Sequence, residues 1–450
     1  MNTVDTIAAI ATGTGGAIGI VRISGPDALK VANRVWRGKT PLSGVHARQM
    51  RLGRIGEPGE PALAVYMPGP ASYTGDDIVE LHCHGGLVAV RRTLDAVLAS
   101  GARSAEPGEF TMRAFVSGKM DLTRAEAVGD LIGARSDSAF KLAARQLSGR
   151  LSGAIANVRG QLLELLSDCE SRLDFPDEKL DWTPPATLAE KLYWTLSEIH
   201  NLRESHHEGA ILRDGVRVVL AGRPNAGKSS LLNLLLGLDR AIVSAIPGTT
   251  RDTLEESAVL RRIPVHLTDT AGLREAHDEI ETIGVARALQ SLDTAQVVFW
   301  LLDSAAEDLE AEVAEFNTHA PRHSGVIAIW NKLDLTRGWQ LPKLASGVPV
   351  VRLSAATGEN LDALLDEFEK QIWNYPHEDE PELAVNARHE ALLSEAAGAL
   401  EPVAAELEKQ RWELAAIGLR EALVALGKII GEGADPDVLE EIFARFCIGK

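Results

Sequence analysis

The fold of the middle of this chain is decided by the stretch Val216-Arg217-Val218-Val219-Leu220-Ala221-Gly222-Arg223-Pro224-Asn225-Ala226-Gly227-Lys228-Ser229-Ser230. Its apolar start predicts a buried strand, its glycine-containing middle a phosphate-binding loop, and the leucines that follow predict a helix. In such a loop, backbone N–H groups turn toward the phosphates and the helix start adds the positive end of its dipole. Lys228 supplies a point charge and Ser229 a hydroxyl ligand for Mg²⁺. We therefore predict a nucleoside triphosphate site that includes Asn225, Ala226, Gly227, Lys228, Ser229 and Ser230.

Two later motifs, in the expected order, indicate that the base is guanine. Asn331-Lys332-Leu333-Asp334 follows an apolar, strand-like run. A carboxylate in that loop can accept both N1–H and the exocyclic amine of guanine, a pair of donors that adenine lacks. Ser354-Ala355-Ala356 follows the next such run and completes the base pocket through backbone amides. The base-side residues of the predicted GTP site are Asn331, Lys332, Asp334, Ser354, Ala355 and Ala356.

The metal side of this site is predicted by two motifs between the phosphate loop and the guanine loop. Asp269-Thr270-Ala271-Gly272 follows an apolar stretch, which places the carboxylate of Asp269 at a strand end, where it can hold the Mg²⁺ shell through water. Residues 247–252 form the first switch, in which Thr250 is the second hydroxyl ligand of Mg²⁺ beside Ser229. The nucleotide contacts predicted here are Ser244, Ala245, Ile246, Pro247, Gly248, Thr249, Thr250, Asp269, Thr270, Ala271 and Gly272.

The residue that orients the attacking water is not the glutamine of Ras-type enzymes. Leu273 stands where that glutamine would follow the Asp269 motif, and a leucine can neither orient water nor take a proton. The acidic segment that follows offers Glu275, Asp278, Glu279 and Glu281, and spacing alone does not choose among them. Asn225 has two interpretations: its amide oxygen either ligates a monovalent cation that replaces an arginine finger, or makes ordinary loop hydrogen bonds.

Length and composition predict a multidomain cytosolic protein. The chain has 450 residues, enough for about three domains, and no apolar run of membrane-span length. Its start has no basic region leading a signal peptide. Cys83, Cys169 and Cys447 are widely spaced, which argues for a reducing compartment. The net charge of −18 means that RNA must be met by a local basic patch or by a partner protein.

Changes of pattern along the chain predict four segments. Residues 1–118 mix strand-like runs, such as 17–23 and 77–82, with turns, and we expect an α+β domain in which 106–110 breaks regular structure. Residues 119–209 and 377–450 show helical periodicity. Residues 210–376 hold the GTP motifs, so we expect one all-α domain interrupted by an inserted α/β P-loop domain of Ras-like fold.

The ends of the chain and the phosphate loop together resemble the family of tRNA-modification GTPases called MnmE or TrmE. The resemblance rests on Cys447-Ile448-Gly449-Lys450, on Pro107-Gly108-Glu109-Phe110-Thr111, on Ile20-Val21-Arg22-Ile23-Ser24-Gly25 and on the order of the GTP motifs. It implies a homodimeric, K⁺-activated GTPase whose first domain binds a tetrahydrofolate derivative of the 5-formyl or 5,10-methylene type. It also implies that the protein adds a carboxymethylaminomethyl or aminomethyl group to C5 of the wobble uridine of tRNA. The partner in this reaction is MnmG, which uses FAD and NADH.

The resemblance assigns roles to individual residues. The folate-binding positions correspond to Arg22, Glu80, Lys119 and Lys450, and the K⁺ site corresponds to Asn225, Ser244, Ile246 and Thr249. Glu281 matches the glutamate that orients the attacking water. Cys447 matches a terminal cysteine that is a candidate for nucleophilic or redox chemistry, and a passive role for this thiol stays open. Ala356 departs from the family pattern, which has a lysine there, and this change is expected to weaken stacking on the base.

Two other functions fit parts of the sequence. A ribosome-assembly GTPase would share the nucleotide motifs, but it would lack the terminal cysteine motif and the folate-binding domain. A folate-dependent methyl carrier with a purely regulatory GTP site would keep both. The motifs at the two ends of the chain argue against the ribosome-assembly GTPase. The methyl carrier would be excluded if a Lys228→Ala variant lost the tRNA modification but still bound folate.

Overall fold

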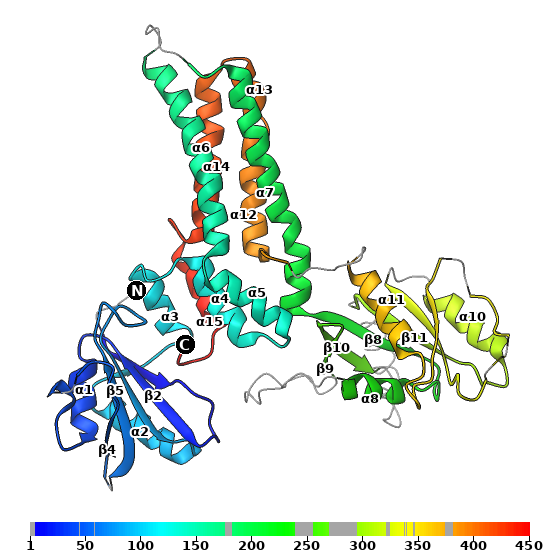
Figure 1. Cartoon of the computed structure of the whole chain (residues 1–450), viewed down its shortest axis with the longest axis horizontal. Helices are drawn as coiled ribbons and strands as arrows, with labels where there is room; N and C mark the ends of the chain where they lie inside the picture. The colour runs from blue at the N-terminus through cyan, green and yellow to red at the C-terminus, as the bar shows by residue number, and fades with distance from the viewer. Residues whose placement is uncertain are drawn as a thin grey trace. The chain divides into compact units, whose positions relative to one another are not determined.

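The chain divides into two compact units in a computed structural model of the whole sequence (Figure 1). The structure describes residues 5–44, 46–57, 59–175, 182–238, 255–269, 295–320, 325–336, 338, 340–344, 347–373 and 381–450. The first unit contains residues 1–132, 143–203 and 387–450, and the second contains residues 133–142 and 204–386. Most of the second unit is therefore an insertion in the sequence of the first.

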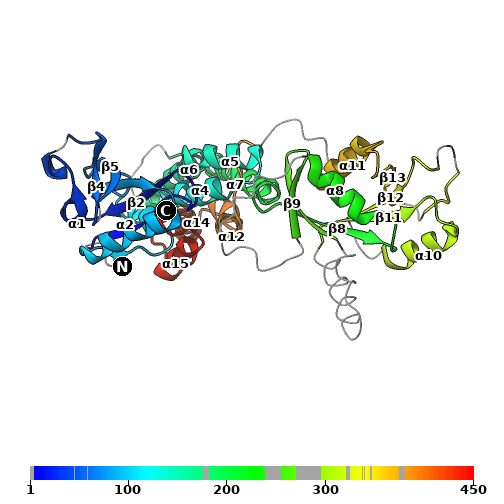
Figure 2. The same cartoon turned by 90° about the horizontal axis from the view of Figure 1, so that it is seen from below.

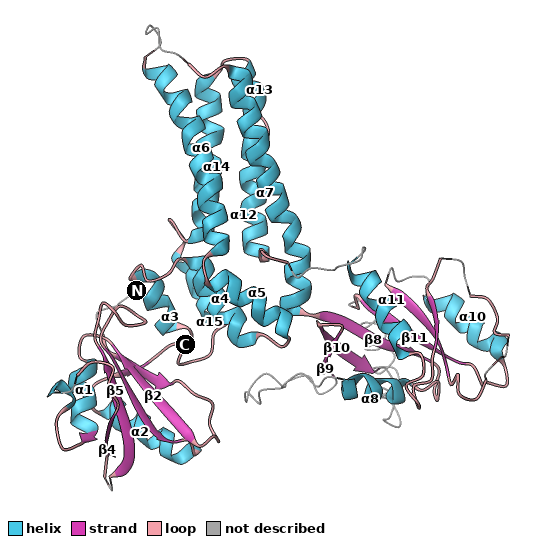
Figure 3. Ribbon diagram, in the orientation of Figure 1, coloured by secondary structure: helices cyan, strands magenta, loops and turns pink. Residues whose placement is uncertain are grey.

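The first unit begins with a mainly antiparallel sheet, which has seven strands within the described residues and the order β3-β4-β5-β6-β2-β1-β7 (Figure 3). All neighbours are antiparallel except β1 and β7. Helices α1 and α2 cover one face of this sheet, and α3 packs on the other through Phe110. The elements are β1 Ile7–Ile10, β2 Ile18–Ser24, α1 Ala28–Val35, β3 Trp36–Arg37, a 3₁₀ turn Leu42–Gly44, β4 Arg51–Ile55, β5 Glu60–Met67, β6 Ile78–His84, α2 Leu87–Ala99, β7 Arg103–Ser104 and α3 Glu109–Val116.

Both strands expected in this region are present, but the expected break at residues 106–110 is shorter. β2 and β6 alternate buried and half-buried residues, as their sequences indicate, and they lie side by side with Arg22 opposite Glu80. The break ends at Gly108. Its backbone is in the left-handed region, with a φ of 66°, and α3 begins at the next residue, Glu109. Phe110 is therefore helical and buried rather than part of a loop.

Long helices complete the first unit, which confirms the predicted all-α region. Helix α14 packs along both α6 and α12 (Figure 1). Their contact faces bury leucines at helical spacing, such as Leu162 and Leu165 on α6 and Leu419 and Leu426 on α14. The helices are α4 Leu122–Gly133, α5 Asp137–Leu147, α6 Arg150–Asp174, α7 Pro185–Asp214, α12 Ala387–Leu400, α13 Val403–Glu408, α14 Trp412–Ile430 and α15 Pro436–Ala444, of which the first part of α5 and the last part of α7 belong to the second unit.

Helix α7 is continuous through the position where a domain limit was predicted. It runs to Asp214, so the limit between residues 209 and 210 lies inside it, and the boundary of the compact units follows Arg203. No helix in the described part of the chain is both long and apolar enough to cross a membrane.

The second unit is the predicted α/β P-loop fold. Over its described residues the sheet has the order β13-β12-β11-β8-β10-β9, and only β9 runs antiparallel to its neighbour. Helices α8 and α11 cover one face, and α10 covers the other (Figure 2). The elements are β8 Val216–Gly222, α8 Lys228–Leu238, β9 Glu255–Leu260, β10 Ile263–Asp269, β11 Val297–Asp303, α10 Leu309–His319, β12 Val326–Asn331, β13 Val350–Arg352 and α11 Leu361–Trp373. The motif residues Asp269 and Asn331 end parallel strands, so they meet at one edge of the sheet, where ligands bind in such folds.

Candidate functional sites

The backbone of the phosphate loop follows a path that only small residues permit. Gly222 has a φ of 131°, and a Cβ atom there would lie 2.2 Å from the carbonyl oxygen of Leu301. Gly227 has a φ of 99°, and a Cβ atom there would lie 2.1 Å from Nδ2 of Asn331. The backbone of Asn225 is also in the left-handed region, with a φ of 63°, and its side chain is exposed. The loop is thus shaped by close approach to two neighbouring strands.

The two polar side chains that begin α8 both contact other parts of the predicted nucleotide site. Lys228 is 6% exposed, and its Nζ donates to the carbonyl oxygens of Gly222 and Arg223 at 2.9 and 2.8 Å. The ammonium group therefore lies against the loop. Oγ of Ser229 donates to Oδ2 of Asp269 at 2.9 Å, so the predicted Mg²⁺ ligand and the predicted outer-shell carboxylate are neighbours. A hydroxyl and a carboxylate are oxygen donors of the kind that Mg²⁺ prefers, and the pair fits this ion.

Asn331 ties the phosphate loop to the two base motifs. Its Nδ2 donates to the carbonyl oxygen of Ala226 at 2.8 Å, and its Oδ1 accepts from the backbone N–H of Ala355 at 2.9 Å. Oγ of Ser354 donates to Oδ1 of Asp334 at 2.6 Å and fixes the carboxylate that we expect to bind guanine. The three motifs, which are far apart in the sequence, therefore converge. Among the other predicted contacts, Ser230 is exposed on α8 and Ala356 is exposed in the turn after β13.

A residue that the sequence analysis missed holds Lys332. Asp303 ends β11, and its Oδ2 lies 2.5 Å from Nζ of Lys332, whose φ is 67°. The sequence contains a signal for it, since Asp303, like Asp269, follows an apolar, strand-like run. That signal does not assign Asp303 a role, because its partner Lys332 lies 29 positions further along the chain.

The remaining predicted residues of the GTP and K⁺ sites lie outside the described residues. They are Ser244, Ala245, Ile246, Pro247, Gly248, Thr249, Thr250, Thr270, Ala271, Gly272 and Glu281.

A second cluster lies in the first unit and contains the predicted folate residues Arg22, Glu80 and Lys450. Nε of Arg22 donates to Oε1 of Glu80 at 2.9 Å, and the guanidinium carbon lies 5.7 Å from the centre of the Phe110 ring. The backbone N–H of Phe110 donates to the carbonyl oxygen of Lys450 at 3.2 Å. His82 is 3.4 Å from Oε2 of Glu80. Phe110 and His82 were not predicted, although alternation along β6 places His82 on the face of Glu80.

Lys119 contacts a neighbouring part of the same unit. Its Nζ donates to the carbonyl oxygen of Pro70 at 2.6 Å. Close by in the sequence, the hydroxyl of Tyr73 lies 2.9 Å from Oγ1 of Thr111, which follows Phe110 on α3. Burial raises the pKa of Tyr73, so this phenol stays protonated and can donate a hydrogen bond.

The last residues of the sequence close this cluster. Ile448 forms an antiparallel bridge with Pro107. Gly449 has a φ of 96°, and a Cβ atom there would lie 2.2 Å from the carbonyl oxygen of Ile10. The segment therefore needs glycine at this position to reach the sheet. Cys447 is exposed beside the bridge.

A buried ionic network holds the start of α3, and with it Phe110. Glu109 is 4% exposed and pairs with Arg103 at 2.7 Å and with Arg113 at 2.9 Å. Its oxygen also accepts from the backbone N–H of Glu106 at 2.8 Å. Burial alone would raise the pKa of Glu109, but the hydrogen bonds from Arg103, Glu106 and Arg113 outweigh it and lower the pKa. The helix is thus fixed by a carboxylate that stays ionised.

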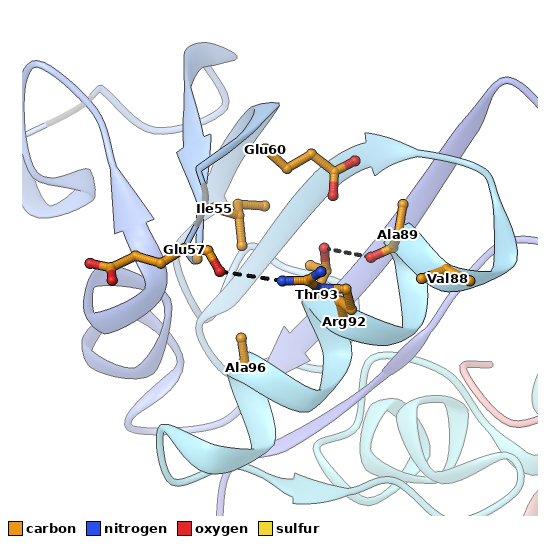
Figure 4. Close-up of a pocket in the computed structure, with 9 residues that line it drawn as sticks. Ile55, Glu57, Glu60, Val88, Ala89, Arg92, Thr93 and Ala96 are labelled. Atoms are coloured by element: carbon orange, nitrogen blue, oxygen red, sulfur yellow. Dashed lines mark hydrogen bonds between the residues drawn. The ribbon is translucent and has the colours of Figure 1, made fainter.

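A hollow of about 410 Å³ lies elsewhere on the first unit, between α2 and the turn joining β4 to β5 (Figure 4). Among the residues that line it, Arg92 donates to the backbone oxygen of Glu57, and Glu60 also lines the hollow (Figure 4). None of the predicted ligand-binding residues lines it, so we assign it no role in the two sites above.

Comparison with known proteins identifies the family of the chain. The family model of the MnmE helical domain matches residues 122–447, and that of the N-terminus of the GTP-binding protein TrmE matches residues 6–119. The tRNA modification GTPases MnmE of Symbiobacterium thermophilum and Geotalea uraniireducens are 46% and 40% identical, each over 99% of both chains. The solved G domain of the T. maritima FeoB iron transporter is 27% identical, covers 35% of this chain and 98% of that chain, and has a TM-score of 0.26. The chain therefore belongs to the tRNA modification GTPase MnmE family.

Proposed function

We propose that the GTPase activity that comes with this family gates a modification at C5 of the wobble uridine of tRNA, and that a tetrahydrofolate derivative supplies the carbon. The observation that supports the proposal is that one chain carries two separate clusters of polar side chains, each containing residues predicted to bind a ligand. The second unit brings together Lys228, Ser229, Asp269 and Asp334. The first unit gathers Arg22, Glu80, Phe110 and the backbone of Lys450.

GTP is held by its base and its phosphates. The carboxylate of Asp334, fixed by Ser354, accepts the two donors of guanine. Lys228 and the backbone N–H groups of the loop bind the β- and γ-phosphates. Ser229 and Asp269 would hold Mg²⁺ together with Thr250 of the first switch, and the ion would neutralise charge that develops on the phosphates.

Hydrolysis is activated by K⁺ in a dimer of the second units. Asn225 supports this assignment because its left-handed backbone presents the side chain at the exposed surface of the phosphate loop. With backbone groups of Ser244, Ile246 and Thr249, its amide oxygen would ligate the ion that takes the place of an arginine finger. Glu281 orients the attacking water, since Leu273 cannot.

The folate derivative binds the cluster of the first unit. A carboxylate such as Glu80 can accept the paired donors of a pterin ring, and Phe110 offers an aromatic face beside it. Arg22, Lys119 and Lys450 are cations that suit the carboxylates of the folate tail. Cys447 lies exposed at the edge of the cluster, where a thiol could reach a reacting carbon.

The full reaction needs further partners. The chain acts as a homodimer together with an FAD- and NADH-using MnmG-like protein, the partner that the family resemblance implies. The tRNA binds the assembly despite the net charge of −18, so a basic partner surface or a local patch must meet it.

The modification itself tests the proposal. Mass spectrometry of tRNA nucleosides from cells that lack this protein should show the loss of carboxymethylaminomethyl- and aminomethyl-uridine. The wild-type gene should restore both nucleosides, whereas genes carrying Lys228→Ala or Glu80→Ala should not. Unchanged nucleosides in the deletion strain would reject the tRNA assignment, and rescue by Lys228→Ala would mean that the GTP site is dispensable for the chemistry.

A further inference from the structure

The mechanism above leaves one buried carboxylate of the second unit without a role. Glu312 lies on α10 and is 4% exposed. Helix α10 carries none of the GTP motifs and begins after the end of β11. A buried carboxylate is costly unless charged or hydrogen-bonding partners surround it, so the partners of Glu312 indicate what it is for.

One oxygen of Glu312 faces the phosphate loop. Its Oε1 lies 3.3 Å from Nη1 of Arg223, the second residue of the loop. The backbone oxygen of Arg223 in turn accepts from Nζ of Lys228 at 2.8 Å. The carboxylate of Glu312 therefore holds the side chain of a residue whose backbone oxygen positions Lys228, the predicted phosphate-binding lysine.

The other oxygen faces the base side of the site. Its Oε2 accepts from the backbone N–H of Asp303 at 3.2 Å. The side chain of Asp303 pairs with Lys332 at 2.5 Å, and Lys332 belongs to the loop that carries Asp334. A single side chain thus connects the phosphate loop to the guanine loop through one residue on each side.

We propose that Glu312 is a positioning residue that couples phosphate binding to guanine recognition and so sets both the affinity for GTP and the selectivity for guanine. Removing it leaves Arg223 with its exposed partner Glu315 alone on one side, and leaves the N–H of Asp303 without this acceptor on the other. The two loops then no longer hold their relative places, although every GTP-contacting residue is still present. This inference rests on the proposed GTP site.

The chain contains a matched control on the same helix. Glu315 also pairs with Arg223, at 3.1 Å from Nε, but its side chain is 36% exposed, and among the described residues this ion pair is the contact that links it to the site. An exposed ion pair contributes little. Loss of Glu315 therefore tests whether weakening the ion pairs of Arg223 is enough to change GTP binding. Loss of Glu312 tests the connection between the phosphate loop and the guanine loop.

The experiment compares the binding of GTP and inosine triphosphate to the full chain by titration calorimetry. Inosine lacks the exocyclic amine, so the ratio of the two Kd values reports how well the Asp334 loop is placed. Glu312→Ala should raise the Kd for GTP about 10- to 100-fold and lower the preference for GTP over inosine triphosphate. Glu315→Ala should change both quantities by less than about 3-fold.

Two further variants keep the test decisive if Glu312→Ala does not fold. The amide of Glu312→Gln can still accept from Asp303 but repels Arg223, and Arg223→Gln removes the other end of the same pair. Both should weaken GTP binding while keeping the preference for GTP. A folded Glu312→Ala protein with the wild-type ratio of Kd values, or equal effects of Glu312→Ala and Glu315→Ala, would overturn the inference. Wild-type protein that binds no GTP would instead reject the proposed function.

Discussion

Asp334 shows how one carboxylate selects a base. Its oxygen is held by Ser354 at 2.6 Å, so the side chain is already placed before guanine arrives. We predict that Asp334→Asn weakens GTP binding about 100-fold, because an amide cannot accept both donors of guanine. The variant should bind xanthosine triphosphate instead, since the amide nitrogen can donate to the additional carbonyl of xanthine. Titration with both nucleotides checks this.

The control for that change is Asp362→Asn, which removes an exposed carboxylate that pairs with Arg261 on the same unit. This variant should bind GTP as the wild type does. Equal loss of affinity for both nucleotides in Asp334→Asn would argue against a direct contact with the base.

Glu80 is the residue on which the folate assignment depends most. We predict that Glu80→Ala weakens the binding of 5-formyltetrahydrofolate about 10-fold or more, because the pterin donors lose a charged acceptor. The Kd for GTP should not change, since the GTP site belongs to the other unit. Calorimetry with each ligand measures both effects. Glu60→Ala is the matched control, because Glu60 lies on the neighbouring strand and pairs with His84 instead. If the Kd for folate rose equally in both variants, Glu80 would not be part of the folate site.

Single residues were predictable where the chemistry is local in sequence. Lys228, Ser229 and Asp334 stand in short motifs, so their neighbours along the chain predict roles for them. Asp303 and Phe110 act through partners that are distant in the sequence, Lys332 and Arg22. Such pairs depend on which strands become neighbours, and one sequence does not contain that information.

At the scale of elements, strands and helices with a clear hydrophobic period were predicted well. The exception is the start of α3, where Pro107 and Gly108 indicate a break. The break is real but ends at once, because Glu109 is pulled inward by Arg103 and Arg113. Tertiary ion pairs decide this boundary, and local turn signals cannot show them.

A second buried ionic cluster joins three helices of the first unit. Glu126 on α4 pairs with Arg388 at 2.8 Å and with His389 at 2.8 Å, at the start of α12. Arg388 also donates to the backbone oxygens of Lys428 and Ile429 at the end of α14, each at 3.0 Å. Helix α12 is the first element of this unit after the insertion, so the cluster anchors the chain where it returns.

The pH dependence of stability should report this cluster. Burial raises the pKa of Glu126, but the charges and hydrogen bonds of His389 and Arg388 outweigh it and hold the pKa at about 2. A carboxyl with a lowered pKa stabilises the fold above its ordinary value of 4.5, and the contribution disappears as the pH falls toward 2. Glu126→Gln should therefore lower the free energy of unfolding by about 3 kcal/mol at pH 7 and by much less near pH 2.

Chemical denaturation at several pH values measures that difference. Glu395→Gln is the control on α12, because its carboxylate is 56% exposed and lies 3.8 Å from Lys428. It should change the stability by less than about 0.5 kcal/mol. A loss for Glu126→Gln that stays constant across this pH range would mean that its ionisation does not stabilise the fold.

At the scale of the whole molecule, hydrolysis should depend on the alkali metal and on dimerisation. We predict that replacing K⁺ by Na⁺ slows GTP hydrolysis about 10-fold or more, because the smaller ion fits the Asn225 site less well and leaves developing charge uncompensated. Steady-state rates in the two salts at equal ionic strength measure this. The rate per chain should also rise with protein concentration in K⁺. Equal rates in both salts would remove Asn225 from its role as a cation ligand.

The overall architecture was predictable because helical periodicity stops before the GTP motifs and resumes after them. The contact of residues 447–450 with residues 107–110 was not predictable from spacing. Some 340 positions separate Pro107 from Ile448, and only the folded structure shows the bridge between them.

That bridge has a consequence for how the protein is made. A ribosome finishes residues 107–110 long before it reaches Ile448, so the nascent chain emerges with this corner of its first domain still open. The corner at residues 107–110 is then completed only after the inserted unit has been synthesised. A polypeptide that stops before residue 447 would hold the residues of the proposed nucleotide site but would lack the bridge that completes the proposed folate cluster.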